Sequence, residues 1–148
     1  MLATQPVGAA EVQGKPRVLA GDTLAIGGRR FRLDGIKAPE LDQICHRAGQ
    51  EYACGKVARA VLWDLIAGHE VTCQPAADTK DAGAGAIPAT CEAGPTNLAE
   101  SMVQAGWAVA DPAGAAPYDQ LEREAKAARR GLWTGEFDRP QAWHEPGR

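Results

Sequence analysis

The pattern of apolar and polar positions near the start of the chain predicts two adjacent strands. Residues 18–26 and 29–36 are rich in apolar side chains and are separated by two glycines. Because glycine tolerates positive φ angles, this spacing favours a type I′ turn and therefore a β-hairpin. In the second strand Phe31 and Leu33 share one face and are expected in the core, whereas Arg32 is expected to point outward.

Helical periodicity replaces this alternation in three later segments. Apolar residues recur every three or four positions over residues 51–67, which predicts the first helix. Asn97 is a suitable cap for a second helix that closes at Gly106. A third helix is predicted from Tyr118 to Leu132, since its apolar positions also follow the helical period.

Further short strands are predicted between these helices. Residues 71–74 and 88–91 favour strands, and the segment 76–86 between them is rich in alanine, glycine and aspartate, which favours a loop. Pro88 lacks a backbone N–H, so it is expected to confine its strand to an edge or a bulge. Residues 107–110 predict a terminal strand or an extended segment.

This order of elements predicts one α+β domain. A chain of 148 residues has room for a single core, and strands followed by helices fit a five-stranded oligonucleotide-binding (OB) barrel with about three helices. We expect a mobile N-terminal arm over residues 1–14, the domain over 15–134, and a tail over 135–148 that packs back on the domain. The four tryptophans are expected to pack in the core or the tail: Trp63, Trp107, Trp133 and Trp143.

The charge pattern permits only a local anion-binding patch. The formal net charge is −3, so the chain as a whole does not attract a polyanion. Arg29, Arg30 and Arg32 fall on the predicted hairpin, with Lys15 and Arg17 nearby, and they are the candidate binding residues. The alternative is an ordinary solvated, charged edge.

Four cysteines raise the question of compartment. Three pairings are possible, and we favour the two local ones, Cys45 with Cys54 and Cys73 with Cys91; four reduced thiols in a cytosolic protein are the alternative. Disulfides imply an oxidising compartment, so a periplasmic or secreted location is expected. Residues 1–16 nevertheless lack a signal-peptide pattern, and the sequence has no apolar run of membrane-spanning length.

Several short motifs occur together and in order along most of the chain. Each is weak alone: Gly21-Asp22-Thr23, Ala38-Pro39-Glu40, Tyr52 with Cys54-Gly55, Asn97-Leu98, Gly106-Trp107-Ala108 and residues 127–133. Together they resemble the thermonuclease, or staphylococcal-nuclease-like, family and in particular its exported bacterial branch. The resemblance implies the OB barrel with its helices for residues 15–134.

The resemblance also implies a set of site residues. Working members hold Ca²⁺ with two aspartates, use a glutamate to activate or orient water, and grip the phosphate with two arginines. By motif, Asp22 matches one metal aspartate, Arg32 the first arginine and Glu40 the glutamate. We interpret these three residues as remnants of the site.

The remaining positions depart from the family pattern. Lys37 stands in place of the second metal aspartate, and Ala38 replaces a threonine that assists it. The second arginine would fall on residues 84–86, which read Ala-Gly-Ala, and Asp111 replaces a tyrosine. We therefore expect a catalytically inactive or severely impaired binding or scaffold module without a cofactor, in which Lys37 forms salt bridges with Asp22 and Glu40.

The alternative is an active Ca²⁺-dependent nuclease with a rearranged site, in which Asp22, Asp34 and Glu40 form a displaced carboxylate cluster. The partner is not readable from the sequence. It is expected to be a nucleic acid or nucleotide on the barrel face, or another protein, and the oligomeric state is not indicated.

Overall fold

A computed structural model describes residues 10–76, 85–111 and 118–138. The strands within these residues are β1 (Val12–Gly14), β2 (Arg17–Ala20), β3 (Thr23–Ile26), β4 (Arg29–Leu33), β5 (Ile36–Lys37), β6 (Cys45–Arg47), β7 (Gln50–Tyr52), β8 (Val71–Pro75), β9 (Ile87–Ala93), β10 (Thr96–Asn97) and β11 (Val109–Ala110). The helices are α1 (Cys54–Ile66), α2 (Leu98–Gln104), α3 (Asp119–Ala127) and the short 3₁₀ helix η1 (Gly131–Thr134).

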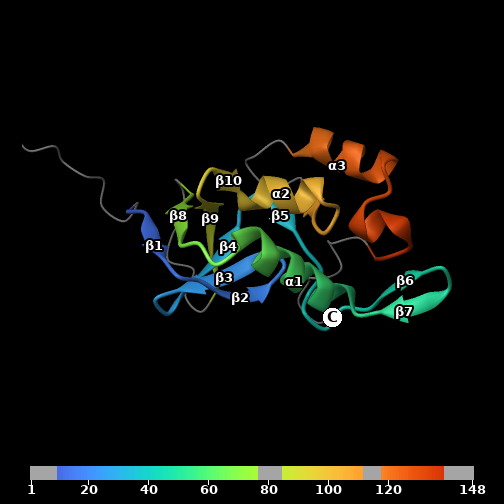
Figure 1. Ribbon diagram of the computed structural model, residues 1–148, viewed down its shortest axis with the longest axis horizontal. Coiled ribbons are helices and arrows are strands. Elements are labelled where there is room, and N and C mark those ends of the chain that lie inside the picture. Colours follow the sequence, from blue (N-terminus) through green and yellow to red (C-terminus); the bar gives the residue numbers. More distant parts are fainter. Residues whose placement is uncertain (1–9, 77–84, 112–117, 139–148) are drawn as a thin grey trace, which may run out of the picture.

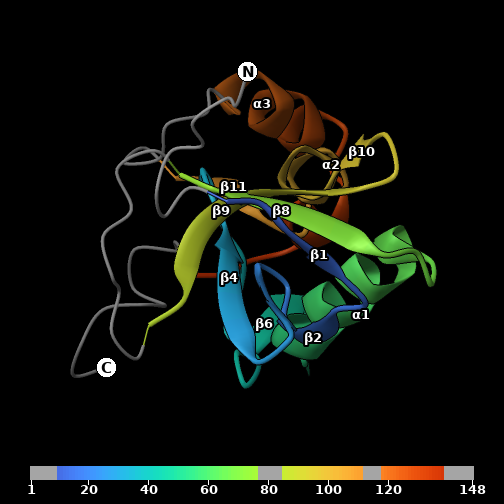
Figure 2. The same cartoon turned by 90° about the vertical axis from the view of Figure 1, so that its left-hand side faces the viewer.

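The largest sheet has seven strands and follows the order β1-β8-β9-β4-β3-β2, with β10 paired to β9. Strands β4 and β9 are parallel, and the other neighbours are antiparallel. Five successive neighbours, from β8 to β2, form a curled layer. Helices α1 and α2 pack on this layer and on one another, and α3 packs on α2 (Figures 1 and 2). This arrangement confirms the predicted α+β, OB-like fold.

The predicted hairpin is formed by β3 and β4. Gly27 and Gly28 have φ angles of 58° and 82°, as a type I′ turn requires. Phe31 and Leu33 are fully buried and Arg32 is exposed, as predicted. The segment 18–26 is not one strand, however, because the chain reverses after β2 and returns as β3.

Helix α1 presents a buried stripe to the core. Cys54, Ala58, Leu62 and Ile66 recur at intervals of four residues and are almost completely buried. The helix begins at Cys54 rather than near residue 51, because the preceding residues pair with β6 as strand β7. It ends where Ala67 adopts a left-handed conformation and donates its N–H to the Trp63 carbonyl.

Pro88 was expected to confine its strand to an edge or a bulge, and the structure contradicts the edge position. Strand β9 is longer than predicted and lies between β8 and β4. Proline is tolerated because Ala89 is the first residue of β9 that pairs with β8, so Pro88 lies just outside that ladder. Its carbonyl instead accepts a hydrogen bond from the Ala76 N–H at 2.9 Å.

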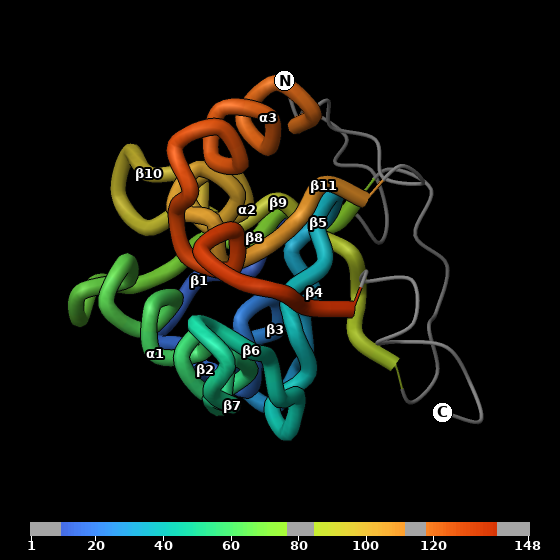
Figure 3. The backbone as a smooth tube through the Cα atoms, turned by 90° about the vertical axis from the view of Figure 1, so that its right-hand side faces the viewer, coloured from blue at the N-terminus to red at the C-terminus, as the bar shows by residue number. Residues whose placement is uncertain are grey.

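The C-terminal elements follow the sequence pattern with one difference. The Asn97 side chain accepts a hydrogen bond from the Glu100 N–H at 3.0 Å, which confirms the predicted cap of α2. The predicted third helix is instead α3 followed by η1, because Arg129 and Gly131 have positive φ angles that interrupt it. Figure 3 shows this segment folded over α2, and β11 pairs with β5.

The two chain ends are only partly described. Residues 12–14 of the predicted arm form β1 and pair with β8, whereas residues 1–9 lie outside the described residues. In the tail, the backbone of Glu136 forms an isolated antiparallel β-bridge with His46. Phe137 packs against the small hydrophobic cluster that contains Leu132. Residues 139–148 and the loop residues 77–84 also lie outside the described part.

Both favoured cysteine pairings are present. Cys45–Cys54 joins β6 to the start of α1, and Cys73–Cys91 links directly opposed residues of β8 and β9. None of the four cysteines is free. No helix among the described residues is long and apolar enough to span a membrane.

Candidate functional site

Asp22 lies in the turn between β2 and β3, and its side chain is only 2% exposed. One carboxylate oxygen accepts a hydrogen bond from the Ala38 N–H at 2.9 Å, and the other accepts one from the Thr23 hydroxyl at 2.9 Å. The Asp22 carbonyl accepts a further bond from the Leu33 N–H at 2.8 Å. Asp22 therefore ties its turn both to β4 and to the segment after β5.

Gly21 makes this close approach possible. A Cβ atom on Gly21 would lie 2.7 Å from the Ala58 Cβ and 2.9 Å from the Ala38 Cβ. These distances are shorter than real Cβ contacts, so any larger residue would push the turn away from α1. The small residues at these three positions set the place of the Asp22 carboxylate.

Glu40 lies in the loop after β5, and this loop rests on the start of α1. The Glu40 carbonyl accepts a hydrogen bond from the Gln43 N–H at 2.9 Å, and the Gly55 N–H donates to the Gln43 carbonyl at 3.3 Å. A Cβ atom on Gly55 would overlap the Glu40 carbonyl oxygen. Gly55 is therefore required by this contact, which explains why it belongs to the motif.

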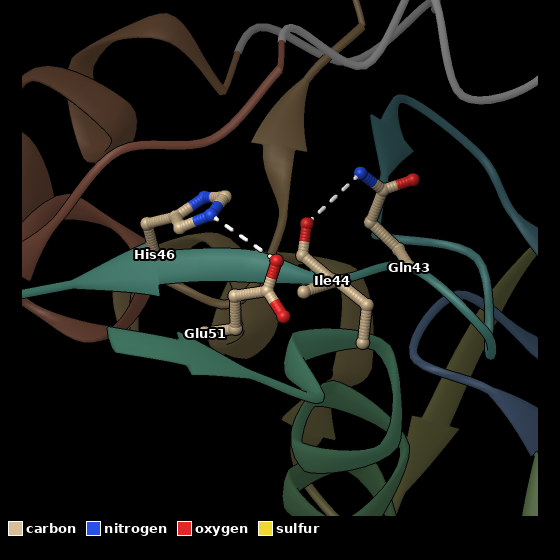
Figure 4. Close-up of polar contacts among 4 residues, drawn as sticks. All are labelled: Gln43, Ile44, His46 and Glu51. Atoms are coloured by element: carbon tan, nitrogen blue, oxygen red, sulfur yellow. Dashed lines mark hydrogen bonds and ion pairs between the residues drawn. The ribbon is translucent and has the colours of Figure 1, made fainter. Parts of the chain in front are cut away.

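The loop continues into the β6–β7 hairpin. Figure 4 shows the Gln43 amide donating to the Ile44 carbonyl, at 3.3 Å, and His46 facing Glu51 across the hairpin, at 3.6 Å. The Cys45–Cys54 disulfide fastens the start of the hairpin to α1. The backbone around Glu40 is thus fixed by a hydrogen bond, a glycine contact and a covalent link.

Lys37 is half-buried in β5, opposite Val109 of β11. It is the residue immediately before Ala38, whose N–H binds the Asp22 carboxylate. The structure therefore places Lys37 beside the residue that binds the Asp22 carboxylate, and Glu40 lies three residues further along the same segment. The salt bridges expected from Lys37 to Asp22 and Glu40 stay a prediction.

The candidate binding arginines do not share one face. Arg17 and Arg30 both pair with Ala25 of β3, and Arg32 is two residues from Arg30, so these three arginines lie on the outer face. Arg29 alternates to the opposite face, where its guanidinium lies 5.5 Å from the centre of the Phe31 ring. We call Arg17, Arg30 and Arg32 the arginine face.

The residues around Asp22 do not fit a Ca²⁺ site. Calcium is held by six to eight oxygen ligands, whereas this site offers one buried carboxylate that already accepts two protein hydrogen bonds. Ala38 contributes no hydroxyl, and Lys37 contributes a positive charge. Across the part of the chain that the structure describes, no group of three or more His, Cys, Asp or Glu side chains is close enough to hold a metal ion.

Asp34 belongs to a different neighbourhood. Its charge acts on Tyr118, whose pKa is raised first by burial of the phenol and then by Glu100 and Asp34, against a hydrogen bond from Asn97 that lowers it. The displaced cluster of Asp22, Asp34 and Glu40 is not gathered among the described residues.

Two positions that depart from the family pattern lie next to segments outside the described residues: the expected second arginine and Asp111. Of the positions expected to carry the second arginine, residue 84 lies outside them, and Gly85 and Ala86 precede β9. Asp111 follows β11, and its N–H donates to the Gly35 carbonyl at 2.9 Å.

Trp63 is the residue whose environment the sequence analysis assigned wrongly. The indole was expected to pack in the core or the tail, yet it is 60% exposed on α1. The sequence did contain a signal, because Trp63 follows buried Leu62 and therefore falls off the stripe that faces the core. Trp107 and Trp133 are half-buried, and Trp143 lies outside the described residues.

Comparisons with known proteins identify a matching family and related sequences. The profile of the family described as staphylococcal nuclease homologue matches residues 30–135. The succinoglycan biosynthesis protein ExoI of Rhizobium meliloti is 30% identical over 141 residues, which cover 92% of this chain and 72% of ExoI. The probable endonuclease LCL3 of Schizophyllum commune is 36% identical over 119 residues, which cover 70% of this chain but 39% of LCL3.

Proposed function

This chain belongs to the family of staphylococcal nuclease homologues, and we propose that it is a binding module that has lost Ca²⁺-dependent cleavage of phosphodiesters. One observation carries the proposal. The Asp22 carboxylate is buried and accepts hydrogen bonds from Ala38 and Thr23, while Lys37 takes the position of its metal-binding partner. The backbone around Asp22 is held in place, but the carboxylate and its neighbours suit hydrogen bonds within the protein better than they suit a cation.

The sign of the charge at position 37 supports this reading. Placing an ammonium about 4–5 Å from a divalent cation costs roughly 7 kcal/mol at an effective dielectric constant near 20, and the attraction of the replaced carboxylate is lost in addition. The single carboxylate of Asp22 does not offset both effects. Metal binding at this place is therefore unfavourable before any step of hydrolysis.

The arginine face is the surface that we assign to binding. Arg30 and Arg32 are exposed, lie two residues apart on the same face of β4, and are joined by Arg17 across Ala25. Guanidinium groups donate paired hydrogen bonds to phosphate oxygens. A nucleotide or a nucleic-acid backbone is the ligand chemistry that this face suits.

The names of the two relatives point in different directions. The name of LCL3 refers to an endonuclease, whereas the name of ExoI refers to succinoglycan biosynthesis. An active nuclease with a rearranged site is therefore the second candidate function. It requires Ca²⁺ ligands other than the set of Asp22, Asp34 and Glu40.

A cleavage assay separates the two candidates. Purified protein is incubated with single-stranded DNA and with RNA at millimolar Ca²⁺, with and without a chelator. We expect no cleavage above that of a buffer control. Cleavage that the chelator abolishes, and that copurifies with the protein through two columns, would refute the binding-module proposal.

Restoring the lost ligands gives a sharper test. In Lys37→Asp with Ala38→Thr, a carboxylate and a hydroxyl return next to Asp22, so Ca²⁺ binding should become measurable by calorimetry. The matched control, Lys37→Gln with Ala38→Thr, removes the ammonium without adding a carboxylate and should bind much more weakly. Equal Ca²⁺ binding by wild type and the aspartate variant would show that Lys37 is not the obstacle.

The two disulfides support a location outside the reducing cytoplasm. We propose a periplasmic or secreted protein. Thiol titration of protein isolated from its native host under denaturing, non-reducing conditions should find no free thiols, and four titratable thiols would contradict the proposal.

A further inference from the structure

The outer face of α1 carries an exposed tryptophan in line with two cations. Lys56 is followed by Arg59, Ala60 and Trp63, which lie three, four and seven residues further along the chain. This spacing places all four residues on one stripe of the helix. All four are exposed, and Trp63 is the most exposed of the large apolar side chains noted at the described surface, at 60%. A single exposed apolar side chain is common on protein surfaces, but tryptophan is enriched at interfaces because its ring combines a large apolar face with an N–H donor.

Trp63 also lies between two hollows of the surface. One hollow, of about 160 Å³, is lined by Trp63 together with Lys15 and His69. The other, of about 310 Å³, is lined by Trp63 together with Lys56 and Arg59. We call these five residues the Trp63 groove, in which the indole forms the wall shared by both hollows.

The groove is positively charged in a chain of net charge −3. The residues that line the two hollows include three obligate cations and no acidic residue. Two carboxylates are near in sequence: Asp64 follows Trp63 and falls about 100° around the helix, and Glu70 accepts a hydrogen bond from the Gln13 amide at 3.1 Å. The local field therefore favours an anionic ligand.

Two of the cations are held in place on opposite sides of the indole. The Arg59 Nε donates to the Val18 carbonyl at 3.1 Å, which orients the guanidinium while its terminal nitrogens carry further donors. On the other side the Lys15 ammonium donates to the Gly68 carbonyl at 2.9 Å. An anion bound here meets charges that are already positioned, which lowers the entropy lost on binding.

A third hollow connects this groove to the arginine face. It has a volume of about 260 Å³, shares Lys15 and Pro16 with the first hollow, and reaches Arg17 and the Gly27-Gly28 turn. A ligand that follows the hollows therefore passes a series of cations along an extended path rather than a single point. This shape suits a flexible polymer.

We propose that the Trp63 groove binds single-stranded nucleic acid, with one base stacked on the Trp63 indole and the flanking phosphates contacting Lys15 on one side and Lys56 and Arg59 on the other. Aromatic platforms between cations are how sequence-tolerant single-strand sites work. A duplex does not offer an unpaired base face to the ring. This site goes beyond the arginine face described above and does not depend on the loss of cleavage.

Binding is measured by fluorescence anisotropy with a labelled twelve-nucleotide oligo(dT) and with an abasic strand of the same length and charge, both in chelator so that cleavage does not interfere. Trp63→Ala should weaken oligo(dT) binding about 5- to 100-fold and leave abasic binding unchanged. Arg59→Gln should weaken both strands to the same extent and reduce the salt dependence of binding by about one unit of slope. Arg123→Gln, an exposed cation on α3, is the matched control and should change neither.

Three results would overturn the proposal. They are equal binding of oligo(dT) by wild type and Trp63→Ala, equal binding of the two strands by wild type, and full displacement of oligo(dT) by an equimolar charge of inorganic polyphosphate. Each would leave a general anion or protein contact as the role of the groove. These outcomes are independent of the cleavage assay. The proposal of the Trp63 groove and the binding-module proposal can therefore be refuted separately. Trp63→Phe, which keeps a ring, should retain part of the oligo(dT) preference if the variant effect arises from stacking.

Discussion

The Asp22 site and the Trp63 groove lie against opposite faces of the same helix and are built in opposite ways. Around Asp22, the backbone is fixed by close contacts at Gly21 and Gly55, and the buried carboxylate accepts hydrogen bonds from the protein itself. In the groove, exposed side chains supply the charge and the aromatic ring, and single hydrogen bonds to backbone carbonyls position Lys15 and Arg59. The proposed loss of metal binding would therefore not loosen the fold, because Asp22, Gly21 and Gly55 also hold the elements together.

The first test changes the contact between Gly55 of α1 and the loop that contains Glu40. Gly55→Ala places a methyl group against the Glu40 carbonyl oxygen, so the loop and α1 must separate. We expect the free energy of unfolding to fall by about 3 kcal/mol, at the upper end for overpacking, as measured by urea denaturation.

Gly68→Ala is the matched control for this substitution. Gly68 has a φ angle of +78° but has open space at the position of a Cβ atom, so only backbone strain of about 1 kcal/mol is expected. If both alanine variants lost the same stability, the contact between Gly55 and Glu40 would not be the reason for the glycine.

The second test asks whether Asp22 now serves the fold. Asp22→Ala leaves the buried Ala38 N–H without its carboxylate acceptor, which should lower the free energy of unfolding by about 2 kcal/mol. The control Asp64→Ala, on the exposed side of α1, should change it by less than about 0.5 kcal/mol. A carboxylate kept only as a remnant metal ligand would instead be neutral or stabilising to remove, since its burial would carry no compensating bond.

The elements that the sequence predicted correctly are those with a local signal. Gly27-Gly28 fixes the β3–β4 turn, Asn97 caps α2 through its own side chain, and the two local cysteine pairs close short loops. These features need only near neighbours, so pattern and spacing are sufficient to find them.

The errors in strand order and in the packing of the site occur where the partner is distant in sequence. Strand β9 is a central strand because it pairs with β8 on one side and with β4 on the other. Strand β4 lies more than fifty residues earlier in the chain, and no local pattern indicates this pairing. In the site, motifs identified Asp22, Lys37 and Glu40 but not that Gly21 meets Ala58 of α1. Arg29 and Trp63 are different cases, because a local pattern of strand or helix faces separates each of them from its neighbours.

The last test concerns the effect of Asp34 on the pKa of Tyr118. It distinguishes a rearranged metal cluster that contains Asp34 from the position of Asp34 near Tyr118. Burial raises the pKa of Tyr118 most, and the charges of Glu100 and Asp34 raise it further. Asp34→Asn should therefore lower the Tyr118 pKa, measured by phenolate absorbance in a Tyr52→Phe background, whereas Asp64→Asn should not. Because the native phenol keeps its proton above pH 10 while the unfolded chain releases it, the contribution of Tyr118 to stability should be fully present below pH 10 and be lost as the pH rises above it. An unchanged Tyr118 pKa in Asp34→Asn would place that carboxylate elsewhere and reopen the rearranged site.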